Sequence, residues 1–157
     1  MRAATIQEIK QEIAGLKPAQ LAELCMRLAK YKKENKELLT YMLFEANDEE
    51  QYIRGIREEI GELMDEINLS HLYFAKKSFR KVGRLINKYS KYSAKKTTEV
   101  ELRIFFLQRI ALTGIAIKRN SVIHNLYLGQ LKKVNALIEG LHEDLQYEYR
   151  REVENLN

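Results

Sequence analysis

The 157-residue sequence has little of the three residue types that most constrain or interrupt a chain: seven glycines, one proline and one cysteine. Few positions therefore break a helix or require a turn, and good helix formers such as Leu, Ile, Glu and Lys are abundant. The single Cys25 excludes an intramolecular disulfide and a cysteine-based zinc site. A lone cysteine favours a reducing compartment, and we expect a cytoplasmic protein.

Long apolar runs are also absent. Residues 1–10 lack the apolar run of a signal peptide. The most apolar stretch, residues 104–117, is too short to span a bilayer and contains Gln108 and Arg109. We therefore expect a soluble chain with no membrane span. With 45% hydrophobic and 31% charged residues, the composition is that of one globular domain over residues 1–157.

Apolar residues recur at spacings of three and four, the period of an α-helix, and no segment has a strand pattern. We predict an all-α fold of about seven helices packed as antiparallel hairpins, either a compact bundle or a short HEAT-like α-solenoid. The solenoid is suggested by residues 28–44 and 89–107, which share a lysine-tyrosine pair, a polar basic turn and an acid-led apolar helix. Two hairpins of similar composition are the alternative.

Helix-capping residues predict where the helices begin. The predicted starts are Thr5 (with Glu8), Lys17–Pro18, Lys36 after a polar connection over 31–35, Asn47–Asp48, Ser70, Thr97–Thr98 and Val122. The last helix extends towards Glu152, with a bend expected at Gly129 or Gly140. The helix that contains residues 104–117 is apolar on most sides, so we expect it at the centre of the core.

One stretch, residues 72–96, contains no Asp or Glu but nine of the 27 Lys and Arg residues. The whole chain has a formal charge of +5, so removing these nine leaves −4 for the remainder. Apolar residues at helical spacing are expected to form a buried seam along this stretch: Leu72, Ala75, Phe79, Val82, Ile86 and Tyr89. The cations then lie on the opposite side of one helix of about 36 Å.

A row of cations attracts acidic proteins and nucleic-acid phosphates. We predict a non-catalytic interaction module whose basic helix, about 72–96, docks an acidic protein partner or a nucleic-acid backbone. An exposed aromatic ring beside the row could stack on bases. The predicted binding residues are Tyr73, Lys77, Arg80, Lys81, Arg84, Lys88 and Lys91. The alternative is that the acids of residues 49–66 or of the last helix neutralise the row.

The segment REEIGELMDEI, residues 57–67, resembles the first metal-binding helix of the all-α nucleotide pyrophosphohydrolases. The resemblance implies that Glu59 and Glu62 form an ExxE pair that holds magnesium beside acids on the following helix. That following helix has no acid in this sequence, so we expect a solvent-facing acidic surface. A metal-dependent nucleotide phosphohydrolase that uses Glu58, Glu59 and Glu62 is the alternative function.

Glu139 and His142 have the ExxH spacing at which one helix offers two ligands to a metal. No second ExxH occurs, and we expect no metal, no cofactor and no enzymatic activity. A further alternative is a structural helical oligomer, such as a homodimer. Its interface would be the last helix or the narrow apolar seam of the fourth helix: Ile53, Ile56, Ile60, Leu63 and Ile67.

Overall fold

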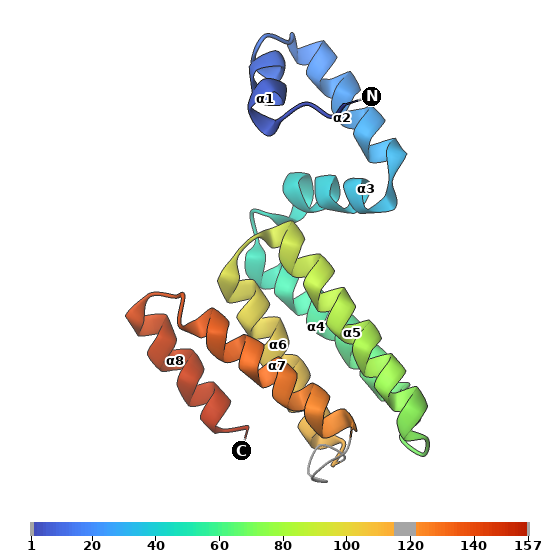
Figure 1. Cartoon of the computed structure of the whole chain (residues 1–157), viewed down its shortest axis with the longest axis vertical. Helices are drawn as coiled ribbons and strands as arrows, with labels where there is room; N and C mark the ends of the chain where they lie inside the picture. Colours follow the sequence, from blue (N-terminus) through green and yellow to red (C-terminus); the bar gives the residue numbers. More distant parts are fainter. Residues whose placement is uncertain (1, 115–121, 157) are drawn as a thin grey trace. The chain divides into compact units, whose positions relative to one another are not determined.

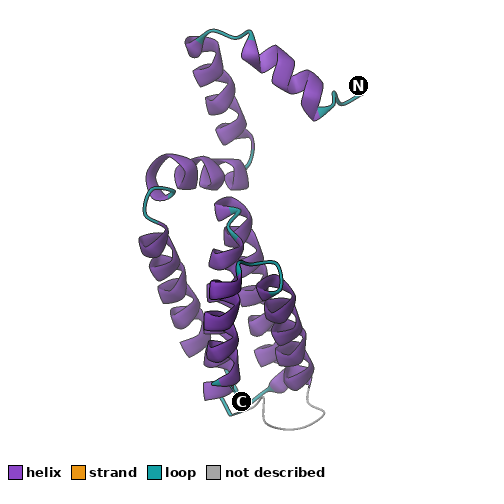
Figure 2. Ribbon diagram, turned by 90° about the vertical axis from the view of Figure 1, so that its left-hand side faces the viewer, coloured by secondary structure: helices purple, strands orange, loops and turns teal. Residues whose placement is uncertain are grey.

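The computed structural model describes residues 2–114 and 122–156. Within these residues the chain forms eight α-helices and one π-helical turn, with no strand (Figures 1 and 2). The all-α prediction is therefore confirmed. The chain divides into two compact units, Met1–Phe44 (unit 1) and Glu45–Asn157 (unit 2). The predictions of a single domain and of a repeat with HEAT-like stacking stay predictions.

Among the helices of the described ranges, none combines the length of a membrane span with a sufficiently apolar composition.

Unit 1 contains α1 (Ile6–Ala14), α2 (Pro18–Tyr31) and α3 (Lys33–Thr40), and the π-turn η1 (Tyr41–Glu45) begins at its end. The capping box of Thr5 and Glu8 and the position of Pro18 in the first turn of α2 are as predicted. The predicted five-residue connection between α2 and α3 is wrong. Lys32 alone separates these helices, and its backbone is extended.

The early start of α3 has a local cause in Glu34 and Asn35. Glu34 lies in the first turn of α3, where the helix dipole favours negative charge. The Asn35 side-chain amide donates a hydrogen bond of 2.9 Å to the carbonyl oxygen of Leu28, near the end of α2. Asn35, a polar residue that predicted a loop, therefore donates a hydrogen bond to a carbonyl oxygen near the end of the preceding helix.

The three α-helices of unit 1 contain no buried residue. Several large apolar side chains are exposed, among them Ile6 at 82% and Phe44 at 76%. Tyr41 apart, all buried hydrophobic residues of the described chain belong to unit 2. The hydrophobic core is therefore a property of unit 2.

Removing residues 1–44 is expected to leave unit 2 folded. The loss in the free energy of unfolding of unit 2 should not exceed about 2 kcal/mol, less than the burial of one large apolar side chain contributes, because unit 2 contains its own buried core. Urea denaturation followed by circular dichroism measures it. Removing residues 139–157, which include the buried Tyr149 and Val153, is the control and should cost more. Loss of the cooperative transition in the 45–157 chain would contradict the expectation.

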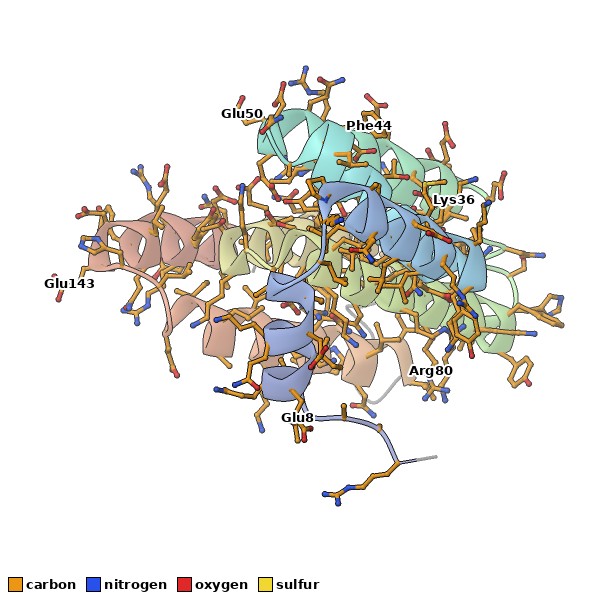
Figure 3. The ribbon with its side chains drawn as sticks, turned by 90° about the horizontal axis from the view of Figure 1, so that it is seen from above. Glu8, Lys36, Phe44, Glu50, Arg80 and Glu143 are labelled. Atoms are coloured by element: carbon orange, nitrogen blue, oxygen red, sulfur yellow. The ribbon has the colours of Figure 1, made fainter. Side chains whose placement is uncertain are left out.

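Unit 2 is a helical bundle around α6 (Lys96–Leu112). Four further helices, α4 (Glu49–Asp65), α5 (Leu72–Ser93), α7 (Val122–Ile138) and α8 (Glu143–Glu154), all pack against it. The pairs α4–α5, α5–α7 and α7–α8 are also in contact, so the four helices follow one another around α6 (Figure 3). Leu102, Phe106 and Leu107 of α6 are fully buried, which confirms its predicted central place.

Two predicted helix starts in unit 2 are wrong, although Asp48 caps α4 as expected, 2.9 Å from the Gln51 N–H. His71, not Ser70, is the N-cap of α5. Thr98 does not cap α6; its hydroxyl donates to Glu49 Oε1 at 2.6 Å, and the Ser93 hydroxyl donates to the same oxygen at 2.5 Å. A carboxylate from α4 therefore binds the α5–α6 junction, a contact between distant segments.

The predicted last helix is divided at Gly140, one of the two expected positions. Gly129, the other, lies within α7. The Lys96 ammonium donates to the Gly140 carbonyl oxygen at 3.3 Å, and a Cβ at Gly140 would lie 2.9 Å from that ammonium. His142 accepts from the Asp144 N–H as the N-cap of α8. Glu139 and His142 therefore do not share one helix, so their ExxH spacing does not place two metal ligands on one helical face.

The seam of α4 is buried inside unit 2. Ile53, Ile56 and Ile60 are buried as predicted, together with Tyr52 and Met64, whereas Leu63 and Ile67 are only half-buried. The buried side is broader than a narrow seam because α4 packs against both α5 and α6. Ile53, Ile56 and Ile60 therefore pack inside unit 2, and the helical oligomer stays a prediction.

Candidate binding face on α5 and α7

The apolar seam of α5 is anchored in the core over its middle part. Ala75, Phe79, Val82 and Ile86 are almost completely buried, as the spacing predicts. The two ends of the predicted seam differ: Leu72 is 54% exposed, and Tyr89 is half-buried. Because the seam fixes the rotation of α5, the opposite side of the helix is turned outwards.

Six of the seven predicted binding residues are exposed on α5: Tyr73, Lys77, Arg80, Lys81, Arg84 and Lys91. Lys88 departs from the prediction. It is half-buried, and its ammonium lies 4.7 Å from the centroid of the Tyr89 ring, within cation–π range.

Acidic side chains of unit 2 leave the exposed row uncovered. In the described part of the chain no ion pair joins Lys77, Arg80, Lys81 or Arg84 to an Asp or Glu. The acids of α4 have other partners: Glu59 accepts from the Tyr89 hydroxyl at 2.8 Å, and Asp65 pairs with Arg109.

Lys95, at the end of the predicted row, is an exception. Its ammonium lies 2.9 Å from Glu49 Oε2 and forms an ion pair. The exposed row of α5 therefore ends at Lys91.

Charge is segregated among the helices of unit 2. α5 has seven Lys and Arg residues and α7 has two, with no Asp or Glu in either helix. α4 has six acids and two arginines, and α8 has five acids and two arginines. Arg80 and Glu143 lie on opposite sides of unit 2 in Figure 3. We call the cations Lys76, Lys77, Arg80, Lys81, Arg84, Lys91, Lys132 and Lys133 the basic face.

A groove of about 480 Å³ lies between α5 and α7. It contains four cations of the basic face, three side-chain amides and no acidic residue. A Cβ built at Gly129 would meet no atom within 4 Å, so the groove is open at this point. The lining residues are Lys76, Phe79, Arg80, Gly83, Arg84, Asn87, Val122, Asn125, Leu126, Gly129, Gln130 and Lys133.

Beside the groove lies Arg103 of α6, a charged residue only 2% exposed. Its guanidinium donates to Gln130 Oε1 at 2.6 Å and to Asn87 Oδ1 at 2.6 Å. It also donates twice to Glu99 Oε1, at 2.9 Å from Nε and 2.5 Å from an Nη atom. Arg103 therefore ties two groove residues, one from α5 and one from α7, to the central helix.

A second hollow of about 420 Å³ at the α5–α6 junction shares Asn87 with the groove. It is lined by Lys91, Lys95 and Lys96, but also by Glu99. Lys95 of this hollow is already paired with Glu49. The acid-free part of the basic face is therefore the groove between α5 and α7.

The acidic side of unit 2 has its own structural contacts. Arg57 of α4 pairs with Glu101 of α6 at 3.0 Å, and the Tyr149 hydroxyl of α8 donates to Glu101 at 3.2 Å. Burial is the main cause that raises the pKa of Tyr149, and the negative charge of Glu101 raises it further. The Tyr149 hydroxyl therefore stays protonated and remains a hydrogen-bond donor between α8 and α6.

No group of three or more His, Cys, Asp or Glu residues in the described ranges could hold a metal ion. Glu58 and Glu62 are exposed on α4, and Glu59 is bound to Tyr89. The neighbouring α5 has no acid to face them. Magnesium at this position would lack the second carboxylate set that the pyrophosphohydrolase resemblance implies.

Sequence patterns alone did not identify the groove residues of α7 or Arg103. The absence of acids from Val122–Ile138 was a usable signal for Lys133. Glu99, four residues before Arg103 on the same helix, was a signal for an ion pair, although not for its burial.

Compared with protein-family models, curated proteins and solved structures, the chain matches none of them.

Proposed function

We propose that this chain is a non-catalytic interaction module that docks an acidic protein partner on the basic face of α5 and α7. One observation supports the proposal most strongly. The cations of two adjacent helices line one groove that has no acidic residue, and Glu59 and Asp65 of α4 bind Tyr89 and Arg109 instead. Folding requires the buried seam of α5, but it does not require an uncovered row of cations.

A protein partner fits the apolar residues that adjoin the cations. Leu72 and Phe74, at the start of α5, are 54% and 57% exposed, only a few residues before Lys77. An acidic segment with interspersed apolar side chains would bury these residues while its carboxylates meet the cations. Exposed ion pairs contribute only about 0.2 to 1 kcal/mol each, so affinity requires several at once. Arg80 and Arg84 can each bind a carboxylate in the stronger bidentate mode.

A nucleic-acid backbone is the second candidate, favoured by Tyr73 and Phe74. Tyr73 is 75% exposed, and the two rings lie edge to face with centroids 5.6 Å apart. Exposed rings beside cations can stack on bases, which contributes about 1 to 3 kcal/mol per base. The phosphates would pair with the same basic face.

Reversing three charges of the face should abolish most of the binding. Lys77→Glu, Arg80→Glu and Arg84→Glu together are expected to weaken binding of a labelled 20-residue polyglutamate peptide by about 100-fold. Each reversal should cost about 1 kcal/mol, and 1.4 kcal/mol corresponds to a factor of ten. Fluorescence anisotropy of the full chain measures the affinity, with a labelled 20-nucleotide single-stranded RNA as the second probe.

The control carries the same change of charge outside the basic face: Arg54→Glu, Arg150→Glu and Arg151→Glu. These residues are exposed on α4 and α8. Equal affinity of both triple variants for the peptide would sink the proposal. Tighter binding of RNA, with log affinity falling by about 0.7 per phosphate contact for each unit of log salt concentration, would instead support the second candidate.

A further inference from the structure

We infer that the groove between α5 and α7 binds a phosphoryl dianion, carried by the acidic partner as a phosphorylated side chain. The inference rests on the proposed function, because the groove is part of the same basic face. It adds a defined subsite and a chemical class of ligand to what is otherwise a surface of positive charge.

The first argument is the number and kind of cations. Arg80 and Arg84 line the groove one turn apart on α5, and Lys133 lines it from α7. Lys76 adds a further ammonium, and no lining residue is acidic. Guanidinium groups present paired N–H donors whose spacing matches two oxygens of a phosphoryl group, whereas ammonium groups act as point charges.

The second argument is the orientation of two amides. A guanidinium group has donors and no acceptor, so Arg103 binds Asn87 and Gln130 through their side-chain oxygens. The NH₂ group of each amide must then face away from Arg103. A Cβ at Gly83, another lining residue, would lie 3.8 Å from Gln130 Nε2. The buried Arg103 therefore fixes Gln130 with its NH₂ group beside the groove residue Gly83, where it is a donor in place of an acceptor.

Arg103 is itself held in this role by Glu99. The Glu99 carboxylate neutralises the buried guanidinium and accepts two of its hydrogen bonds. The charge of Arg103 is thus compensated within the protein, and the groove cations remain for a ligand. Ligand binding needs no rearrangement of either amide, which reduces its entropic cost.

The third argument compares phosphate with carboxylate. A carboxylate has one negative charge and two oxygens, whereas a phosphoryl group has about −1.5 to −2 charges at pH 7 and three terminal oxygens. Four cations and three side-chain amides line the groove, and the Gln130 amide presents its NH₂ group beside Gly83. One carboxylate would leave most of these donors unmatched. A phosphoryl dianion accepts from more of them and neutralises more of the charge.

The test uses the full chain and three labelled nine-residue peptides. Each peptide has eight glutamates around a central serine, phosphoserine or glutamate. At constant ionic strength and pH 7.5, the phosphoserine peptide should bind about tenfold more tightly than the other two, because the extra charge-assisted hydrogen bonds form in the groove. The preference should shrink at pH 5.5, below the second phosphate pKa of about 6.

Gln130→Glu is the sharpest variant. It keeps the oxygen that accepts from Arg103 and converts the amide donor into an anionic oxygen, so the fold is supported and the phosphoryl group is repelled. The tenfold preference should disappear. Gln108→Glu, the same substitution at an exposed position of α6, should retain the preference. Lys133→Met, which removes an exposed ammonium of α7, should also reduce the preference.

The outcomes separate this inference from the proposed function. Equal binding of the three peptides would overturn the phosphoryl site and leave docking of an acidic partner intact. Failure of all three peptides to bind would overturn both. If the phosphoserine peptide still binds more tightly to Gln130→Glu and Lys133→Met, the phosphoryl group binds outside the groove and the inference is overturned. Tighter binding of a nine-nucleotide oligouridylate, lost in Gln130→Glu, would assign the groove to a nucleic-acid backbone and overturn the phosphorylated partner.

Discussion

Phe106→Ala is expected to lower the free energy of unfolding by about 3 to 5 kcal/mol, the range for removal of a large buried aromatic side chain. Phe106 is fully buried in α6, the helix that all other helices of unit 2 contact. Its ring centroid lies 6.4 Å from that of Phe79 on α5. The substitution therefore opens a cavity at the centre of the bundle and removes a contact between α5 and α6. Urea denaturation followed by circular dichroism measures the loss.

The matched control is Leu112→Ala, at the end of the same helix. Leu112 is 78% exposed, and its replacement should change the free energy of unfolding by about 0.5 kcal/mol or less. Comparable losses for the two variants would show that α6 is not the centre of the core.

Glu99→Ala is expected to cost about 3 kcal/mol, although Glu99 itself is partly exposed. The side chains of Arg103 and Glu99 are 3% and 29% exposed, and the substitution leaves the Arg103 guanidinium buried without a counter-charge. Removing one member of a buried ion pair costs about 3 to 5 kcal/mol. The lower end applies because Asn87 and Gln130 still accept hydrogen bonds from Arg103. Chemical denaturation at pH 7 measures the effect.

Glu62→Ala removes an exposed acid from α4 and should be nearly neutral. A loss of less than about 1 kcal/mol for Glu99→Ala would mean that the Arg103 charge is hydrated in the folded protein.

The double variant Glu99→Ala, Arg103→Met tests the same point. If the Arg103 charge is hydrated, adding Arg103→Met should recover little of the free energy of unfolding. If the charge is desolvated, the double variant should recover part of the loss, because it removes the uncompensated buried charge.

Features that depend on neighbouring residues in sequence were predicted well. The three- and four-residue spacing placed Phe79, Val82 and Ile86 on the buried side of α5, and it therefore placed Arg80 and Arg84 outside. The apolar character of α6 on most sides identified the central helix. Caps also follow from short-range chemistry, as Thr5 and Asp48 show.

Features that depend on contacts between distant segments were not predicted. Thr98 looked like a cap because its hydroxyl is suited to one, but Glu49, 49 residues earlier, accepts that hydroxyl. Lys95 was predicted as part of the basic row, but in the structure its ammonium forms an ion pair with Glu49, the same carboxylate. The groove requires α7 beside α5, and no sequence pattern states which helices become neighbours. Arg103 lies in an apolar run, where its partners Asn87 and Gln130 come from other helices.

The separation of acidic and basic helices around α6 gives unit 2 an electric dipole moment that points across the bundle. A polyanion that approaches from any side exerts a torque on this dipole and turns α5 and α7 towards itself before contact. At physiological ionic strength the screening length is about 8 Å, so unit 2 turns only when the polyanion is within about this distance of its surface. The association rate constant should therefore depend on salt more steeply than the dissociation rate constant.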